Sequence, residues 1–167
     1  MKYSANFKNR ILPIVYPIIA SIVFTSFYTE IFLEAWYTEF RIFSIIVYIL
    51  FLAYTLGIPL IIQCNFNTSD KGKEIIVTAE QKQIIIKKNN IILLDVKYDD
   101  ICEVVIHQTN NYKQRTVNWF SWSAYYYYEI ILKNGESYKI SRLLIYDFDK
   151  KISSLDFRCK NYFIPLI

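Results

Sequence analysis

Residues 42–62, IFSIIVYILFLAYTLGIPLII, contain no charged side chain, and fourteen of these 21 residues are Ile, Leu, Val or Phe. An α-helix rises about 1.5 Å per residue, so the stretch is just long enough to cross a hydrocarbon layer of roughly 30 Å. Each of the fourteen contributes about −0.3 to −0.6 kcal/mol to insertion, so the sum favours a membrane span. A buried helix of a soluble protein is the alternative, but a domain of this size rarely contains a helix that is apolar on every side.

A second uncharged run, residues 11–28, precedes this stretch and is at the lower limit of length for a span. Pro13 and Pro17 lie in its first two turns, where the missing amide hydrogens disturb a helix least. A cleaved signal peptide is the alternative, but the residues after the apolar core do not resemble a small-x-small cleavage site. We therefore expect residues 11–62 to form a transmembrane helical hairpin.

The basic residues predict how this hairpin is oriented. Residues 1–10 carry three basic side chains and no acid, whereas the loop 29–41 carries three glutamates and one base, at its end. Lys71 and Lys73 follow the second span. Because basic residues collect on the cytoplasmic side, we expect residues 1–10 and the C-terminal part to be cytoplasmic and the loop 29–41 to lie outside. The protein would then be a multi-pass protein of the bacterial cytoplasmic (inner) membrane.

After a polar linker at residues 63–73, the periodicity changes from helical spacing to two-residue alternation, which is typical of strands. Asn89-Asn90 and Asn134-Gly135 are hairpin-turn signals. From Asp147 the apolar residues fall on one side of a helix, which predicts a closing helix over residues 147–160. The predicted strands are residues 74–78, 83–87, 91–96, 101–107, 116–120, 126–133 and 137–142.

The stretches VTAEQKQIIIKKNNIILLDVKYDDICEVVI and YYEIILKNGESYKIS, followed by the predicted helix, resemble the bacterial pleckstrin-homology-like (PH-like) domains that often follow a pair of membrane helices. The resemblance covers about residues 74–160. It implies an α+β membrane protein: a two-helix hairpin, then a cytoplasmic seven-stranded antiparallel barrel over residues 74–167 with a C-terminal helix as its cap. It also implies a module that binds proteins or lipid headgroups.

Catalytic chemistry has little support in the sequence. His107, the single histidine, ends a predicted strand without a nearby base or nucleophile, and we interpret it as a surface histidine. Asp99 and Asp100 are adjacent, so on an extended chain they point to opposite faces, and a turn is the better interpretation. The three cysteines are far apart and the glycines are isolated, so we expect no metal, no cofactor and no enzymatic activity. A net charge of +4, spread along the chain, gives no reason to expect nucleic-acid binding.

Two groups of side chains are candidates for binding. The stretch NWFSWSAYYYY is rich in aromatic residues, which are typical anchors of protein interfaces. The alternative is that its two faces are core and a surface covered by the closing helix or by the membrane. The candidates for partner binding are Trp119, Trp122, Tyr125 and Tyr127. The candidates for weak binding of anionic lipid are Lys82, Lys87 and Lys88.

We therefore expect a membrane-anchored, non-enzymatic binding module that recruits or inhibits a protein partner at the cytoplasmic face of the inner membrane. Anchoring raises the effective concentration of such a module for partners at the membrane. Two alternatives stay open: an immunity protein that neutralises a bacterial toxin, and a sensor of anionic lipid headgroups. The sequence leaves the partner, a toxin or a membrane complex, and the oligomeric state open.

Overall fold

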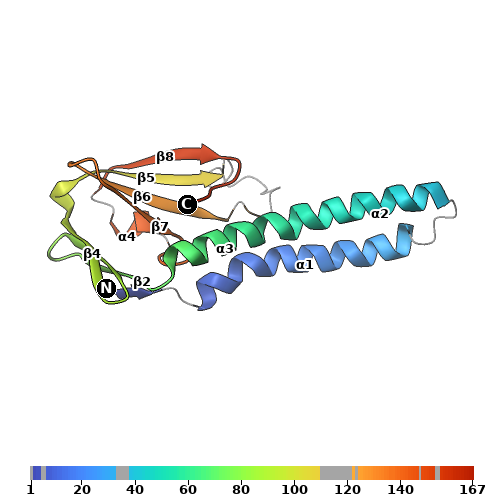
Figure 1. The fold of residues 1–167 in the computed structure, drawn as a ribbon, viewed down its shortest axis with the longest axis horizontal. Helices are drawn as coiled ribbons and strands as arrows, with labels where there is room; N and C mark the ends of the chain where they lie inside the picture. The colour runs from blue at the N-terminus through green and yellow to red at the C-terminus, as the bar shows by residue number, and fades with distance from the viewer. Residues whose placement is uncertain are drawn as a thin grey trace.

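A computed structural model describes residues 2–4, 7–32, 38–109, 122, 124–146, 148–152 and 155–167. Helix α1 (Phe7–Phe32) is followed by α2 (Thr38–Leu52), the π-helical turn η1 (Ala53–Gly57) and α3 (Ile58–Asp70). The last three follow without a break and form one long rod beside α1 (Figure 1). Pro59 lies in the first turn of α3 and has no amide hydrogen, so one main-chain hydrogen bond is missing where η1 ends.

One of the two expected spans is long and apolar enough to cross a membrane. Among the described residues this is the helix Ile42–Asp70, judged by length and composition, whereas the apolar stretch Pro17–Tyr28 is shorter. The helices are also longer than the predicted spans of residues 11–28 and 42–62. Of the expected outer loop, residues 33–37 lie outside the described part of the chain.

The two long helices contact each other through polar side chains and through the ring of Phe24, which stacks on those of Tyr48 and Phe51. Three hydrogen bonds between side chains connect them: Ser21–Thr55 (3.1 Å), Thr25–Tyr48 (2.8 Å) and Tyr28–Ser44 (3.1 Å). We call these six residues the hydroxyl seam. Large apolar side chains on the same helices, such as Ile22, Phe43 and Leu50, are exposed instead. This arrangement is the reverse of a helix pair in water, where the polar residues face outward.

The strands form two four-stranded sheets at one end of the helix pair (Figure 1). Sheet A has the order β1-β2-β3-β4, and sheet B has the order β7-β6-β5-β8. The strands of sheet A are β1 (Lys2–Ser4), β2 (Lys73–Thr78), β3 (Gln83–Lys88) and β4 (Ile91–Lys97). Those of sheet B are β5 (Ile101–Thr109), β6 (Tyr126–Leu132), β7 (Ser137–Ser141) and β8 (Phe157–Tyr162).

Six of the seven predicted strands are confirmed, and the strand expected at residues 116–120 lies outside the described residues. Both predicted hairpin turns form, with positive φ angles at Asn89 (50°), Asn90 (67°) and Gly135 (88°). Asp99 and Asp100 lie in a short 3-10 turn (Tyr98–Asp100), as expected. The local signals of alternation and turn chemistry therefore identified these strands.

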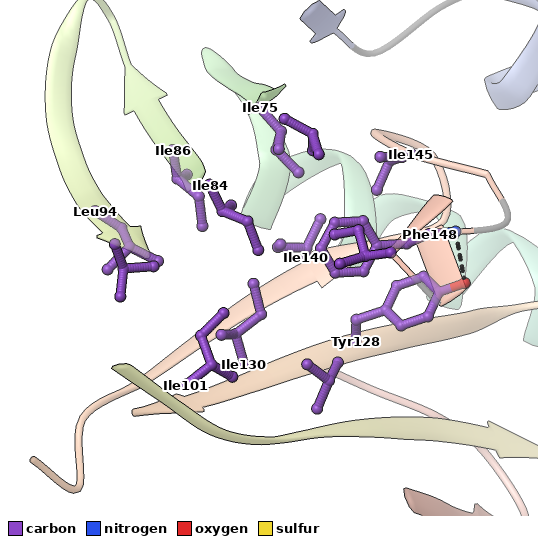
Figure 2. Close-up of a cluster of buried hydrophobic side chains, with 14 of the residues drawn as sticks. Ile75, Ile84, Ile86, Leu94, Ile101, Tyr128, Ile130, Ile140, Ile145 and Phe148 are labelled. Carbon is purple, nitrogen blue, oxygen red and sulfur yellow. Dashed lines mark hydrogen bonds between the residues drawn. The ribbon is translucent and has the colours of Figure 1, made fainter. Parts of the chain in front are cut away.

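The inner faces of the two sheets make the main hydrophobic core. Figure 2 shows Ile84, Ile86 and Leu94 of sheet A on one side of this core, with Ile130 and Ile140 of sheet B opposite them. In β3, Ile84 and Ile86 are buried and the residues beside them are not, as the alternation of the sequence requires.

The prediction of a closing helix over residues 147–160 is wrong. Helix α4 covers only Phe148–Lys151, and the residues that follow include β8, which pairs in parallel with β5 from Val104 to Thr109. Phe148 and Ile152 of the predicted apolar stripe are buried in the core, but Cys159 is exposed. A free strand edge of β5 offers main-chain hydrogen bonds to this segment, and such a tertiary contact outweighs local periodicity. The domain is therefore a pair of four-stranded sheets and not a seven-stranded barrel with a helical cap.

The two ends of the helix pair also differ from the expectation. The N-terminal residues were expected only as a cytoplasmic tail, but β1 pairs antiparallel with β2 as an edge strand of sheet A. The predicted linker, residues 63–73, is helical up to Asp70 and turns at Gly72, whose φ is +73°. Phe66 explains the helix, because its ring is fully buried against sheet B and holds this turn of α3 in place.

Candidate functional site

The outer face of sheet B packs against α3, and this contact connects the sheets to the long helix. Its buried side chains form a second cluster: Ile62, Phe66, Trp122, Tyr125, Tyr127 and Leu143. Ile58, Ile164 and Ile167 pack at its margin. We call this contact the junction.

Trp122 is the largest side chain in the junction and is fully buried. Its ring meets the ring of Tyr54 edge-on, with 4.7 Å between the centroids, and contacts Phe163 at 5.5 Å. Its Nε1–H donates a hydrogen bond to the carbonyl oxygen of Phe163 (2.8 Å). Trp122 therefore joins three separate parts of the chain: the long helix, the segment before β6 and the residues after β8.

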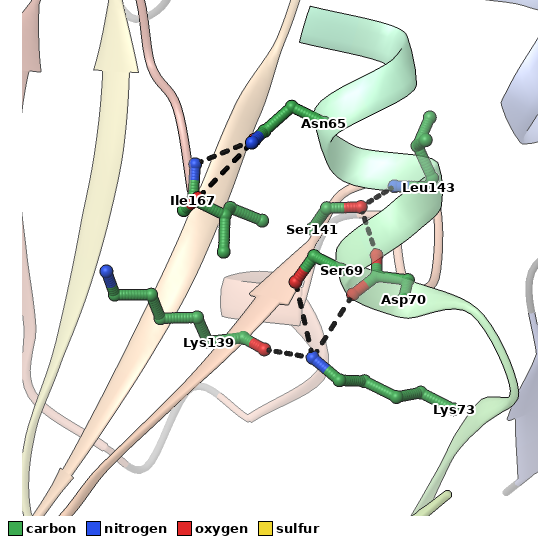
Figure 3. Close-up of polar contacts among 8 residues, drawn as sticks. All are labelled: Asn65, Ser69, Asp70, Lys73, Lys139, Ser141, Leu143 and Ile167. Atoms are coloured by element: carbon green, nitrogen blue, oxygen red, sulfur yellow. Dashed lines mark hydrogen bonds and ion pairs between the residues drawn. The ribbon is translucent and has the colours of Figure 1, made fainter. Parts of the chain in front are cut away.

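Polar contacts fix the orientation of the junction. The Tyr125 hydroxyl donates to Oε1 of Gln63 (3.0 Å) in the buried part of the contact. The side-chain amide of Asn65 donates to the carbonyl of Ile167 (3.3 Å) and accepts from its amide (2.9 Å), as Figure 3 shows. Burial raises the pKa of the Tyr125 hydroxyl, so it remains protonated and able to donate at neutral pH.

A buried carboxylate lies at the end of α3 (Figure 3). Asp70 accepts a hydrogen bond from the Ser141 hydroxyl of β7 and is 3.6 Å from Nζ of Lys73. Lys73 also donates to the carbonyl of Lys139 (3.2 Å), so it connects β2 to β7. Because a buried carboxylate is costly without partners, this group requires α3, β2 and β7 to keep their relative positions.

The aromatic residues that we expected at a surface belong to this junction. Trp119 lies outside the described residues. Trp122, Tyr125 and Tyr127 are buried, which corresponds to the alternative in which one aromatic face is covered. Helix α3 and the segment after β8 cover them, in place of the closing helix that the sequence suggested. Their role in partner binding stays a prediction, and the role that the structure shows is to hold the sheets on the helix.

The three lysines expected to bind lipid are not in one cluster. Lys82 precedes β3 and Lys88 ends it, so the length of the strand, about 3.3 Å per residue, separates them. Lys87 and Lys88 lie beside the Asn89-Asn90 turn, whose amide at Asn89 donates to the carbonyl of Gly72 (2.9 Å). The start of β4 next to this turn is apolar and exposed: Ile91 (68 %), Ile92 (54 %) and Leu93 (40 %).

His107 is buried, so the interpretation as a surface histidine was wrong. Its ring stacks between Tyr127 (4.4 Å between centroids) and Tyr162 (5.3 Å), and its Nε2 is 2.8 Å from Oε2 of Glu129. No local pattern in the sequence indicates this group, because its members come from β5, β6 and β8.

Burial lowers the pKa of His107, although the hydrogen bond and charge of Glu129 oppose this effect; Lys160 and Lys139 lower it further. Burial alone would raise the pKa of Glu129, but the contact with His107 lowers it. Burial also raises the pKa of the Tyr127 hydroxyl to about 12, so the tyrosine beside His107 is neutral. The buried stack therefore favours a neutral imidazole.

Acidification is expected to destabilise the domain through His107. The unfolded chain takes up a proton near pH 6.5, whereas the folded chain does so only at lower pH, so the stabilisation present above pH 6.5 is lost as the pH falls below it. The melting temperature of the purified protein in detergent at pH 7.5 and at pH 5.5 measures this effect. His107→Gln should reduce the difference, since Glu129 titrates below this range. An equal difference in both proteins would contradict the prediction.

The described residues contain no group of three or more His, Cys, Asp or Glu side chains that could hold a metal ion. Polar groups of the junction instead pair with one another, as Tyr125 does with Gln63 and Asn65 does with Ile167. The junction therefore has the geometry of a folded scaffold held on a helix.

A comparison with protein families matches residues 2–151 to the family described as "PH domain". This match covers more than half of the chain. The chain belongs to the PH domain family. The match begins at β1 and includes both long helices as well as the two sheets, and PH domains are generally non-catalytic binding modules. A search of curated proteins and a search of solved structures gave no match.

Proposed function

We propose that this PH domain is a membrane-anchored binding module that recruits or inhibits a protein partner at the cytoplasmic face of a bacterial inner membrane. In this proposal α1 and the rod of α2, η1 and α3 both cross the bilayer. The observation that carries it is the hydroxyl seam: hydrogen-bonded polar side chains lie between the helices, beside the stacked rings of Phe24 and Phe51, and large aliphatic side chains lie outside.

The distribution of side chains on the two helices supports two membrane spans, because in lipid the polar side chains must face the protein and the apolar side chains can face outward. In lipid, Ser, Thr and Tyr hydroxyls need partners within the protein, and they typically hydrogen-bond across helix pairs. The three hydrogen bonds of the seam satisfy this need. The exposed apolar residues run from Ile11 to Phe27 on α1 and from Ile42 to Ile61 on the rod, about 24 and 28 Å at 1.5 Å per residue. Both lengths are close to the hydrocarbon thickness.

The position of the exposed β4 residues favours a protein partner over lipid. From Ile61 to Asp70 the helix continues for about 14 Å, and the β3–β4 turn contacts Gly72 beyond that end. The headgroup layer is only about 5–8 Å thick on each side of the hydrocarbon. With an upright helix, Ile91, Ile92 and Lys88 would lie beyond it. We therefore propose the start of β4 as the partner surface, because exposed apolar patches are typical of protein contacts.

Labelling of the native cysteines tests anchoring and orientation. Cys102 and Cys159 are exposed on the sheets. In spheroplasts, a maleimide that does not cross membranes should label neither, and both should react after lysis. The protein should also stay in the membrane pellet at alkaline pH. Labelling in intact spheroplasts, or release at alkaline pH, would contradict the proposed topology.

Site-specific photo-crosslinking in cells tests the partner surface. A photoreactive amino acid at position 92 should give one discrete protein adduct, and Ile91→Thr should remove it. The same probe at exposed Asn134, in the β6–β7 turn, serves as the matched control. Adducts to lipid only, or equal protein adducts at both positions, would contradict a protein partner at β4.

A further inference from the structure

The residues after β8 return to the long helix and end beside α3 (Figure 1). Their main chain is held by Trp122, through the carbonyl of Phe163, and by Asn65, through Ile167. Ile164 and Ile167 pack inward in the junction. Phe163, whose ring meets Trp122 at one edge, is 62 % exposed, and Leu166 is 46 % exposed. The segment thus has one apolar side in the protein and a second apolar side in contact with solvent.

The level of this segment along the helix is set by the junction. Trp122, which contacts Phe163, also contacts Tyr54 at the ring edge, and Ile58 packs in the same cluster. On the same turns of the helix, Leu60 and Ile61 face away from the sheets and are 46 % and 62 % exposed. Residues 54–61 are therefore apolar on the covered side and on the free side.

We propose that the segment Phe163–Leu166 is a second membrane contact, which enters the interfacial layer of the cytoplasmic leaflet. This inference rests on the proposed function, since it requires the rod to cross the bilayer. If residues 42–61 lie in the hydrocarbon, then Tyr54 is about 10 Å inside its edge at Ile61. Asn65, which binds Ile167, is about 6 Å outside that edge, so the segment between the Trp122 and Asn65 contacts crosses the boundary where the interfacial layer begins.

The chemistry of the segment fits a lipid surface better than a second protein. Phe163 and Leu166 present an apolar face, and the half-exposed ring of Tyr162 lies next to them. Amphipathic aromatic rings collect at the level of the headgroups. Arg158 and Lys160 of β8 are exposed just before the segment and carry the positive charge that anionic headgroups attract. The helix turns that carry the junction also expose Leu60 and Ile61, so apolar side chains are exposed on both at this level, and this favours the bilayer as the occupant.

Fluorescence depth measurement tests the inference. Cys64, Cys102 and Cys159 are first replaced by serine, and one cysteine is introduced by Phe163→Cys, Leu166→Cys or, as the control, Ile91→Cys. The full chain, labelled with an environment-sensitive fluorophore, is reconstituted in vesicles of phosphatidylethanolamine and phosphatidylglycerol. Nitroxide lipids should quench probes at 163 and 166 severalfold more than the probe at 91, and their emission should be blue-shifted.

Alkaline extraction of the same vesicles separates the two proposals. If the protein resists extraction but probes at 163 and 166 behave like the probe at 91, the second membrane contact is refuted and the spans stand. If alkali releases the protein, the membrane anchor is refuted and the inference with it. Because Leu166 has no ring contact with Trp122, its probe reports depth even if Phe163→Cys disturbs the junction.

Discussion

Trp122→Ala is expected to lower the free energy of unfolding by about 3–5 kcal/mol, the usual cost of replacing a buried Trp or Phe with Ala. The residue is fully buried and joins Tyr54 to Phe163, so the cavity would open where three parts of the chain meet. The melting temperature of the protein in mild detergent, followed by circular dichroism, measures the loss.

Trp122→Phe is the matched control for this prediction. It keeps a ring in the junction and removes the Nε1–H donor to the carbonyl of Phe163, so a smaller loss of about 1–3 kcal/mol is expected. An alanine variant with an unchanged melting temperature would refute the role of Trp122 in the junction. If that variant were stable but lost a partner adduct, the original prediction of a partner-binding aromatic surface would gain support.

Lys73→Met is expected to lower the free energy of unfolding by about 3 kcal/mol. Asp70 would remain buried without its counterion, and breaking a buried ion pair by removing one partner typically costs about 3–5 kcal/mol. The lower end of this range applies because the Lys73 side chain is 14 % exposed. Methionine keeps most of the aliphatic stem, so the change reports mainly on the charge. Chemical unfolding in detergent, followed by tryptophan fluorescence, measures the loss.

The double variant with Asp70→Asn and Lys73→Met distinguishes the ion pair from simple packing. The asparagine has no charge to leave unpaired, and it can still accept a hydrogen bond from Ser141. The double variant should therefore be more stable than the sum of the two single losses predicts. Strictly additive losses would show that Asp70 and Lys73 do not stabilise each other.

Local rules were sufficient for most of the strands but not for their assembly. Two-residue alternation identified β3 and β4, and Asn-Asn and Asn-Gly identified the turns, because these signals act between neighbours in sequence. The alternation also predicted that one face of β6 would be core. None of these signals says which strand pairs with the free edge of β5. The periodicity of residues 157–162 therefore predicted the end of a helix. Their long-range pairing with β5 instead makes them strand β8.

The candidate site was harder to predict, since its contacts join residues that are far apart in sequence. The aromatic stretch was recognised, but its surface role was inferred from composition, and Phe66 of α3 covers it. The Asp70 group joins α3, β2 and β7, and the His107 group joins β5, β6 and β8. No spacing in the sequence brings these partners together. Phe66 was the one available signal, an aromatic residue within a polar stretch that was assigned to a linker.

The pairing of β1 with β2 has a mechanical consequence. The strand before α1 and the strand after α3 are neighbours in sheet A, so the helix pair is a long insertion between two adjacent strands. A domain that is connected to its neighbour by a single chain segment can rotate about that segment. Here two chain segments leave the same sheet side by side and connect it to the helix pair, so torque on either helix is transmitted to the sheet. The sheets should therefore turn with the helix pair as one body.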